Sequence, residues 1–455
     1  MEILEYFMEK LKNKKIDDAI LSFNANHSRQ IKFSDNKLVK DSVEYLSDVG
    51  LFIVKDKKIF TTTYKDTVDE TGLASGIGNL NEMKKKEIDK FIERILKFLK
   101  TAHPNEDYRG INNKIFKYKE IEDAYDSKIN KLDDHDYVQR AMNAAFKEGV
   151  KRTNGIFEVH DYKNIILTSY GSKFSDRKSE LYLSLRGFIE KDESGHMNGV
   201  SRIVKGLNPE KIGSQAGEIA KKAKSPVNGK RGKYDLIFSP MAIAPILNSI
   251  GDSASIFSVE SEMSFFSDKL NKKVGSSEIT IYDDGTLANG IGSSKADMEG
   301  VPTQKTMIIE KGIYKNYLHN VSTARKHGVE TTGNAGLIAP DPWNVVVKKG
   351  DTSLNEMIKC TKKGIYITNV WYTRFANYHT GDFSTIPRDG AFLIENGKIT
   401  QSIKGIRISE NVLKMLNNIK HVGDNPVHLR TWEAELPVLT PHILFKDCQI
   451  TTPTI

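Results

Sequence analysis

Side chains that could do chemistry are plentiful in this sequence, but they do not form a complete catalytic pattern. The eleven histidines are scattered along the chain. None begins an HExxH or HExxxH sequence, in which one helix would hold two metal-binding imidazoles and a carboxylate base. We therefore expect the histidines to be surface or hydrogen-bonded residues, and we expect no metal site in this chain.

Two further segments contain reactive residue types without the arrangement that catalysis needs. The segment 378–385, YHTGDFST, contains His379, Asp382 and Ser384, but a triad needs three differently directed backbones and rarely forms from near neighbours. Cys360 lies among lysines with no histidine nearby, so a partly buried helix cysteine is expected rather than a nucleophile. The segment 72–79, GLASGIGN, lacks the GKS or GKT ending of a phosphate-binding loop and is predicted to be an ordinary loop.

Composition narrows the class of protein. A chain of 455 residues predicts about two domains. The net charge of +8 comes from lysines interspersed with acidic residues, which favours solvated helix faces over a nucleic-acid surface. The apolar runs are well short of the roughly 20 residues that cross a bilayer, and the amino terminus does not look like a signal peptide. With only two cysteines, we expect a cytoplasmic protein without membrane contact.

The elements that must position any site alternate between helices and strands in the first half. Apolar residues at helical spacing predict helices over 1–15, 84–102 and 136–153. Asn208 is the expected N-cap, and Pro209 the first residue, of a helix over 208–223. Period-two runs broken by Asn, Asp and Gly predict an antiparallel meander over 17–64.

The second half is predicted to be mainly β. Its strand-like runs include a hairpin with the dipeptide Asn396-Gly397 at a type I′ turn. The fold class is therefore α+β, with a helix-plus-antiparallel-sheet domain over 1–228 and a mainly β domain over 229–455. The uncharged run 238–251, FSPMAIAPILNSIG, is expected to fill a core.

Several segments of the second half occur in a characteristic order. They are GKYDLIFSP (232–240), IYDDGTL (281–287), TTGNAG (331–336), TGDFS (380–384) and IKHVGDN (419–425). In order and spacing they resemble the TldD/PmbA (TldE) family of metalloproteases. The resemblance is specific over 229–455 and looser over 1–228.

The resemblance implies a TldE/PmbA-like member. In TldD the HExxxH zinc helix follows the strand that corresponds to YDLIFSP, so its three positions fall on Ala242, Ile243 and Leu247, which have no ligand atoms. A third ligand, a cysteine, is expected soon after VGDN, where this chain has none, and Cys448 lies further on in the final strand. The family also carries an older description as modulator of DNA gyrase.

What the resemblance implies for function is a subunit that is inactive by itself. A TldE-like chain pairs with a zinc-bearing TldD-like chain in a heterodimer that cleaves unfolded or flexible peptides. The alternative is a non-catalytic homodimer that binds extended peptides at a sheet edge.

Candidate residues for a peptide groove or a subunit interface follow from this interpretation. Small and polar residues in 331–336 and 379–384 would allow a peptide backbone to approach closely, although plain turns are the alternative. The aromatic run 369–383 suggests an interface, with an internal core strand as the alternative. The candidates are Gly333, Asn334, Trp371, Tyr372, His379, Gly381 and Asp382.

Overall fold

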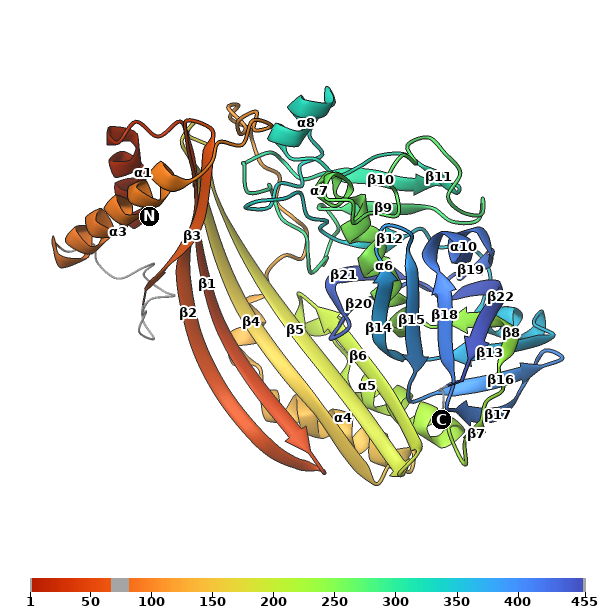
Figure 1. The fold of residues 1–455 in the computed structure, drawn as a ribbon. Helices are drawn as coiled ribbons and strands as arrows, with labels where there is room; N and C mark the ends of the chain where they lie inside the picture. Colours follow the sequence, from red (N-terminus) through yellow and green to blue (C-terminus); the bar gives the residue numbers. More distant parts are fainter. Residues whose placement is uncertain (1, 67–81, 453–455) are drawn as a thin grey trace.

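The computed structural model describes residues 2–66 and 82–452, so the predicted loop 72–79 lies outside the described residues. The first half of the chain forms one long, curved antiparallel sheet with the strand order β3-β2-β1-β4-β5-β6 (Figure 1). Its strands are β1 (Asp18–Ser34), β2 (Lys37–Lys55), β3 (Lys58–Asp66), β4 (Arg152–Thr168), β5 (Lys173–Glu190) and β6 (Glu193–Ser201). The first three strands are the predicted meander.

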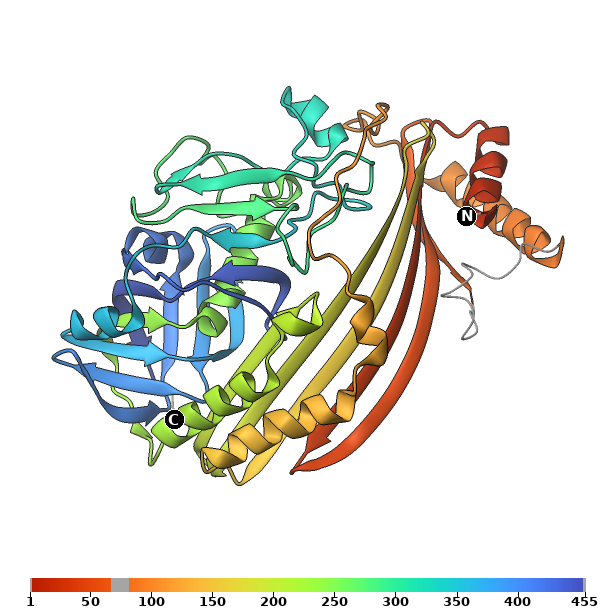
Figure 2. The same cartoon turned by 180° about the vertical axis from the view of Figure 1, so that it is seen from behind.

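Helices cover one face of this sheet, with a different pair at each end (Figures 1 and 2). Leu21 and Phe23 of β1 pack against the first pair, and Ile31 and Phe33, on the same face of β1, belong to the cluster of the second pair. The first pair is α1 (Glu2–Asn13) and α3 (Glu82–Thr101), and the second is α4 (Asp134–Lys147) and α5 (Pro209–Lys222). Short 3-10 turns are η1 (Ser127–Lys131) and η2 (Val204–Gly206).

The predicted helices are present, but the one predicted to run to residue 153 ends at Lys147, because strand β4 begins at Arg152. The apolar stripe of α1 is buried, as predicted, at Leu4, Phe7, Met8 and Leu11. The side chain of Asn208 accepts a hydrogen bond from the backbone N–H of Lys211, so it caps α5 as expected.

The second half consists of two sheets with helix α6 (Pro240–Ala254) packed against strands of both. The larger sheet contains β7 (Val227–Asn228), β8 (Gly232–Phe238), β13 (Lys363–Ile367), β14 (Val370–Asn377), β15 (Asp382–Pro387), β16 (Ala391–Glu395), β17 (Lys398–Lys404), β18 (Arg407–Asn411), β19 (Ile419–Val422) and β22 (Ile443–Thr451). The smaller sheet contains β9 (Ile281–Asp284), β10 (Lys305–Glu310), β11 (Ile313–Tyr314), β12 (Val345–Val347), β20 (Val427–Thr431) and β21 (Ala434–Thr440). The other helices are α7 (Ile256–Glu260), α8 (Val321–His327), α9 (Leu354–Lys359) and α10 (Val412–Asn417). The α+β class and the mainly β second half are therefore confirmed.

Local details of this half agree with the sequence at one turn and disagree at one cysteine. Asn396 and Gly397 both have positive φ, 48° and 77°, as the predicted type I′ turn between β16 and β17 requires. Cys448 is buried in β22. The expected partial burial of Cys360 is wrong, because this residue is the exposed C-cap of the short surface helix α9, whose buried position is occupied by Met357.

The two halves meet through buried polar contacts. Arg202, only 1% exposed, donates hydrogen bonds from its guanidinium to the carbonyls of Gly290, Ile291 and Ser293. Burial lowers the pKa of Arg202 to about 10. The boundary at residue 229 stays a prediction, and β7 just before it already pairs with β17 of the second half.

Candidate functional site

Helix α6 begins with a conventional cap and then runs through the core. The Ser239 hydroxyl accepts a hydrogen bond from the Ala242 N–H (3.2 Å) and donates to the Thr368 carbonyl (2.6 Å), so it also ties the helix to the loop after β13. Pro240 occupies the first turn, where its missing N–H has no cost. The uncharged run 238–251 is therefore a core helix, as the sequence predicts.

The three positions that the family resemblance aligns with a zinc motif are sealed from solvent. Ala242 is 0% exposed, and Ile243 and Leu247 are each 2% exposed. Ile243 and Leu247 line a void of about 10 Å³ whose lining is entirely apolar. Its residues are Ile243, Ile246, Leu247, Ile250, Ile279, Ile281, Val412, Met415, Leu416, Ile419, Ile443 and Phe445. These residues do not fit a metal, because none provides a nitrogen, oxygen or thiolate ligand there.

The next turns of α6 reach an open hollow of about 450 Å³. Asn248 and Asp252 of α6 form one wall, Arg374 of β14 another, and the turn between β20 and β21 a third. The residues around it are Asn248, Asp252, Arg374, Trp432, Glu433, Glu435 and Leu436. We call this hollow, together with Trp371 and Tyr372 beside it, the aromatic groove.

Exposed aromatic side chains line the groove where three elements meet. Trp371 and Trp432 contact each other with ring centroids 6.1 Å apart, and Tyr372 lies 6.2 Å from Trp371. Their exposed fractions are 39% for Trp371, 48% for Tyr372 and 53% for Trp432. Interpreting 369–383 as an internal core strand is therefore wrong, because β14 is an outermost strand of its sheet. An exposed cluster of this kind is typical of a binding surface.

Polar contacts hold the groove in shape. The Glu433 carboxylate accepts a hydrogen bond from the Thr373 N–H (2.8 Å), which fixes the β20–β21 turn against the edge of β14. The Asn248 side chain accepts a hydrogen bond from the Leu436 N–H (3.0 Å), which ties the start of β21, just after this turn, to α6. Tyr372 has a φ of 60° at an irregularity in the pairing of β14 with β15, so the edge is locally bent there.

Carboxylates give the groove a negative character. Asp252 is exposed on the wall of the hollow, and its carboxyl lies against protein on one side; this partial burial and the neighbouring charges of Asp341 and Glu435 raise its pKa to about 6. Glu433 and Glu435 add two more acidic groups. Two arginines oppose them: Arg374 lies 3.9 Å from Glu433 and stacks on Tyr372, and Arg388 stacks on Trp371. The groove can therefore attract a cationic group and stack apolar or aromatic side chains.

The other candidates on the β14–β15 hairpin lie at its tip. His379 and Asp382 are exposed, and Asp382 accepts hydrogen bonds from Thr380 and Asn411. Gly381 has a φ of 80°, and a Cβ on it would lie 3.3 Å from Phe265. The hairpin thus carries Trp371 and Tyr372 near one end and this tip at the other.

The remaining two candidates lie in the interior near the smaller sheet. Asn334 is 1% exposed and donates hydrogen bonds to Asp283 (2.7 Å) and to the Asp341 carbonyl (2.9 Å). Gly333 is buried, and its carbonyl accepts a hydrogen bond from the Trp343 indole (2.9 Å). Neither residue lines the aromatic groove, and the groove role of the seven candidates stays a prediction.

The structure adds residues that sequence reasoning missed. Trp432 and Glu433 follow the VGDN segment, in the stretch where the family resemblance implies a cysteine ligand. A tryptophan in a polar turn is the one signal that pointed to them. Over residues 2–66 and 82–452, no group of three or more His, Cys, Asp or Glu side chains could hold a metal ion. No helix in that part of the chain is both long and apolar enough to cross a membrane.

Solved structures of other proteins have the same fold. The fold is shared with TldE of Thermococcus kodakarensis, at 22% identity, a TM-score of 0.83 and 99% coverage of both chains. It is also shared with a Thermotoga maritima protein proposed as a modulator of a DNA gyrase, at 24% identity and a TM-score of 0.84, covering 98% of this chain and 100% of that one. The fold of this chain is therefore the fold of these two proteins.

The sequence comparisons give the family. Residues 231–452 match the model of the PmbA/TldA metallopeptidase C-terminal domain. A metalloprotease of Methanocaldococcus jannaschii is 29% identical over 430 residues, which cover 89% of each chain. The chain belongs to the TldD/PmbA family.

Proposed function

We propose that this chain is a TldE/PmbA-like, metal-free subunit of a cytoplasmic TldD/TldE-type metalloprotease. Its role is to hold an unfolded or flexible peptide for a zinc-bearing TldD-like partner. One combined observation carries the proposal. The chain has an exposed aromatic groove, and helix α6 beside it has no metal ligand at the family's zinc positions. The chain binds and positions, and it supplies no catalytic side chain.

The groove suits an extended peptide for physical reasons. The outer edge of β14 is not paired with any strand among the described residues, so its backbone can accept a further strand away from the Glu433 contact. Aromatic side chains offer large contact areas at low entropic cost, and the carboxylates select for lysine or arginine. Holding a peptide in line can contribute several kcal/mol to a reaction without a reacting group from the holding subunit.

Binding tests the proposal directly. A fluorescein-labelled, unstructured, lysine-containing peptide is titrated with the purified chain, and anisotropy is recorded. Trp432→Ala is expected to weaken binding at least about tenfold, because it removes an exposed hot-spot side chain. The matched control is Ile399→Ala, which removes an exposed apolar side chain from β17, 42% exposed against 53% for Trp432. If the two variants bound the peptide with equal affinity, the aromatic groove would not be the peptide-binding site.

Catalysis tests the subunit role. Addition of a zinc-bearing TldD-like protein from the same source is expected to produce cleavage of the unfolded peptide, and Trp432→Ala is expected to slow it. The second candidate function is a homodimeric peptide-binding protein without proteolysis, which the same groove also supports. This second function is supported if the chain binds the peptide but neither associates with a TldD-like protein nor cleaves the peptide in its presence.

A further inference from the structure

The long antiparallel sheet β1–β6, which we call the first-half sheet, reaches the aromatic groove through the strand before Trp432. Strand β20 packs against β6 of this sheet. The carbonyl of Arg430 on β20 accepts a hydrogen bond from the Asn198 side chain of β6 (2.9 Å). Arg430 comes only two residues before Trp432 in the chain. The turn between β20 and β21, which forms one wall of the groove, is therefore attached to the first-half sheet at its base.

An ion pair crosses the same contact. The Arg430 guanidinium lies 3.0 Å from the carboxylate of Glu180 on β5 and 3.7 Å from the carboxylate of Glu158 on β4. It also lies over the ring of Tyr182, 5.4 Å from the ring centroid. The Glu180 side chain is only 7% exposed. Because a buried carboxylate without its partner carries a large desolvation cost, this ion pair resists displacement of β20 from the sheet.

A second ion pair holds the chain next to the other tryptophan of the groove. The Arg388 guanidinium lies over the Trp371 ring, 4.3 Å from the ring centroid. The next residue, Asp389, accepts hydrogen bonds from the Arg186 guanidinium of β5 and from the Ser194 hydroxyl of β6 (2.8 Å). The Asp389 side chain is 1% exposed. The pair of Arg186 and Asp389 therefore fixes the segment that packs on Trp371 to the first-half sheet.

Asn369 adds a connection from the first-half sheet to the start of β14. Its side-chain amide donates hydrogen bonds to the second oxygen of Asp389 (3.0 Å) and to Nδ1 of His196 on β6 (3.1 Å). Its side-chain oxygen accepts a hydrogen bond from the N–H of Val370, the first residue of β14 (2.9 Å). The first-half sheet thus holds β14 one residue before Trp371.

We infer that the first-half sheet positions the aromatic groove, with Arg430 and Asp389 as the positioning residues for its two tryptophans. The indoles are 6.1 Å apart but belong to segments of different sheets, so their separation depends on what holds those sheets together. The partners of the two positioning residues, Glu180 and Arg186, lie on the same face of β5, because an even number of positions separates them. One strand therefore serves both links. This inference rests on the proposed function in one respect, since the groove is the peptide site proposed above.

Circular dichroism measures the positioning without any peptide. Two indoles this close give an exciton couplet, and Trp432→Phe identifies this couplet by removing it. Arg430→Met and Asp389→Asn should each remove most of the couplet, because each breaks one link while both indoles stay in the chain. Arg430→Lys should keep most of it, since it keeps a positive charge opposite Glu180. The Arg430 side chain is 30% exposed, so its variants keep the test valid even if the more deeply buried Asp389→Asn fails to fold.

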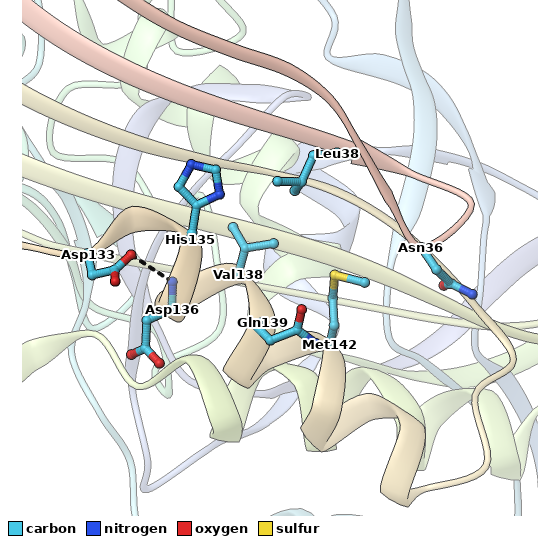
Figure 3. Close-up of a pocket in the computed structure, with 8 residues that line it drawn as sticks. All are labelled: Asn36, Leu38, Asp133, His135, Asp136, Val138, Gln139 and Met142. Atoms are coloured by element: carbon cyan, nitrogen blue, oxygen red, sulfur yellow. Dashed lines mark hydrogen bonds between the residues drawn. The ribbon is translucent and has the colours of Figure 1, made fainter.

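The matched control is Asp134→Asn, which breaks another partly buried ion pair. The Asp134 carboxylate at the start of α4 accepts hydrogen bonds from the Arg29 guanidinium of β1 (2.6 and 2.9 Å). Figure 3 shows this end of α4, with the neighbouring residues Asp133 and His135. Urea unfolding should show a comparable loss of stability in Asp134→Asn, but the couplet should be unchanged, because both residues of this pair belong to the first half.

Peptide anisotropy separates this inference from the proposed function. Arg430→Met and Asp389→Asn should weaken peptide binding about tenfold, the loss expected for removal of the Trp432 side chain. If the couplet is lost but binding is unchanged, the positioning is supported and the groove is not the peptide site. A couplet as strong as in wild type in folded Arg430→Met, or an equal loss of the couplet in Asp134→Asn, would overturn the inference.

Discussion

Replacing Ile243 by glutamate tests whether this position of helix α6 belongs to the apolar core or to a site that water and polar groups can reach. The Ile243 side chain is 2% exposed and faces an apolar lining with no polar partner. Loss of its buried apolar surface costs about 2 kcal/mol. Burial raises the pKa of such a carboxyl by about 3 units or more, so neutralising it at pH 7 costs about 4 kcal/mol in addition.

The sum of about 6 kcal/mol is comparable with the whole stability of a typical domain, about 5–15 kcal/mol. The pH dependence has a definite sign. Because the folded-state pKa is raised, the folded protein binds the extra proton, and the penalty shrinks as the pH falls towards the unfolded pKa of about 4.3. Between pH 7 and pH 5 the variant should regain about 3 kcal/mol relative to wild type.

Urea unfolding followed by fluorescence at pH 5, 6, 7 and 8 measures this. Ile243→Gln has nearly the same shape as the glutamate variant but cannot ionise, so its cost should not depend on pH relative to wild type. Ile243→Val should cost only about 0.5–1.5 kcal/mol. If the glutamate and glutamine variants had equal stability at every pH, position 243 would have access to water or a polar partner, and the reasoning from the sealed void would be refuted.

Three further outcomes are expected. Elemental analysis of the purified chain should find no stoichiometric zinc, and one equivalent bound would contradict the reading of Ala242 and Leu247 as ligand-free positions. The affinity of the aromatic groove for a lysine-containing peptide, measured by anisotropy, should fall between pH 8 and pH 5. The raised pKa of Asp252, about 6, means that this carboxylate loses its negative charge in that range. Asp252→Asn should remove this part of the pH dependence. Arg202→Met should lower the free energy of unfolding by about 3 kcal/mol, measured in urea, because it leaves the buried carbonyls of Gly290 and Ser293 and the half-buried carbonyl of Ile291 without their charged donor.

Local features of this protein follow from the sequence because neighbouring residues determine them. Periodicity located α1, the side chain of Asn208 located the start of α5, and the positive φ required at Asn396 and Gly397 located a hairpin. The lack of metal ligands at Ala242, Ile243 and Leu247 can likewise be read from residue types once the helix has been recognised. Each of these conclusions depends on contacts within a few residues.

Only the tertiary structure decided where the aromatic residues lie and which of them are exposed. A run such as 369–383 has the same composition whether it is a central or an outermost strand, and the long-range pairing that makes β14 an edge cannot be read from local pattern. Trp432 meets Trp371 because β20 and β21 belong to the other sheet and their turn reaches across α6 to β14. Burial of Cys360 was misjudged for the same reason, since exposure depends on which elements pack over a helix end. Local chemistry determined the elements, whereas the groove depends on contacts between segments that are distant in the chain.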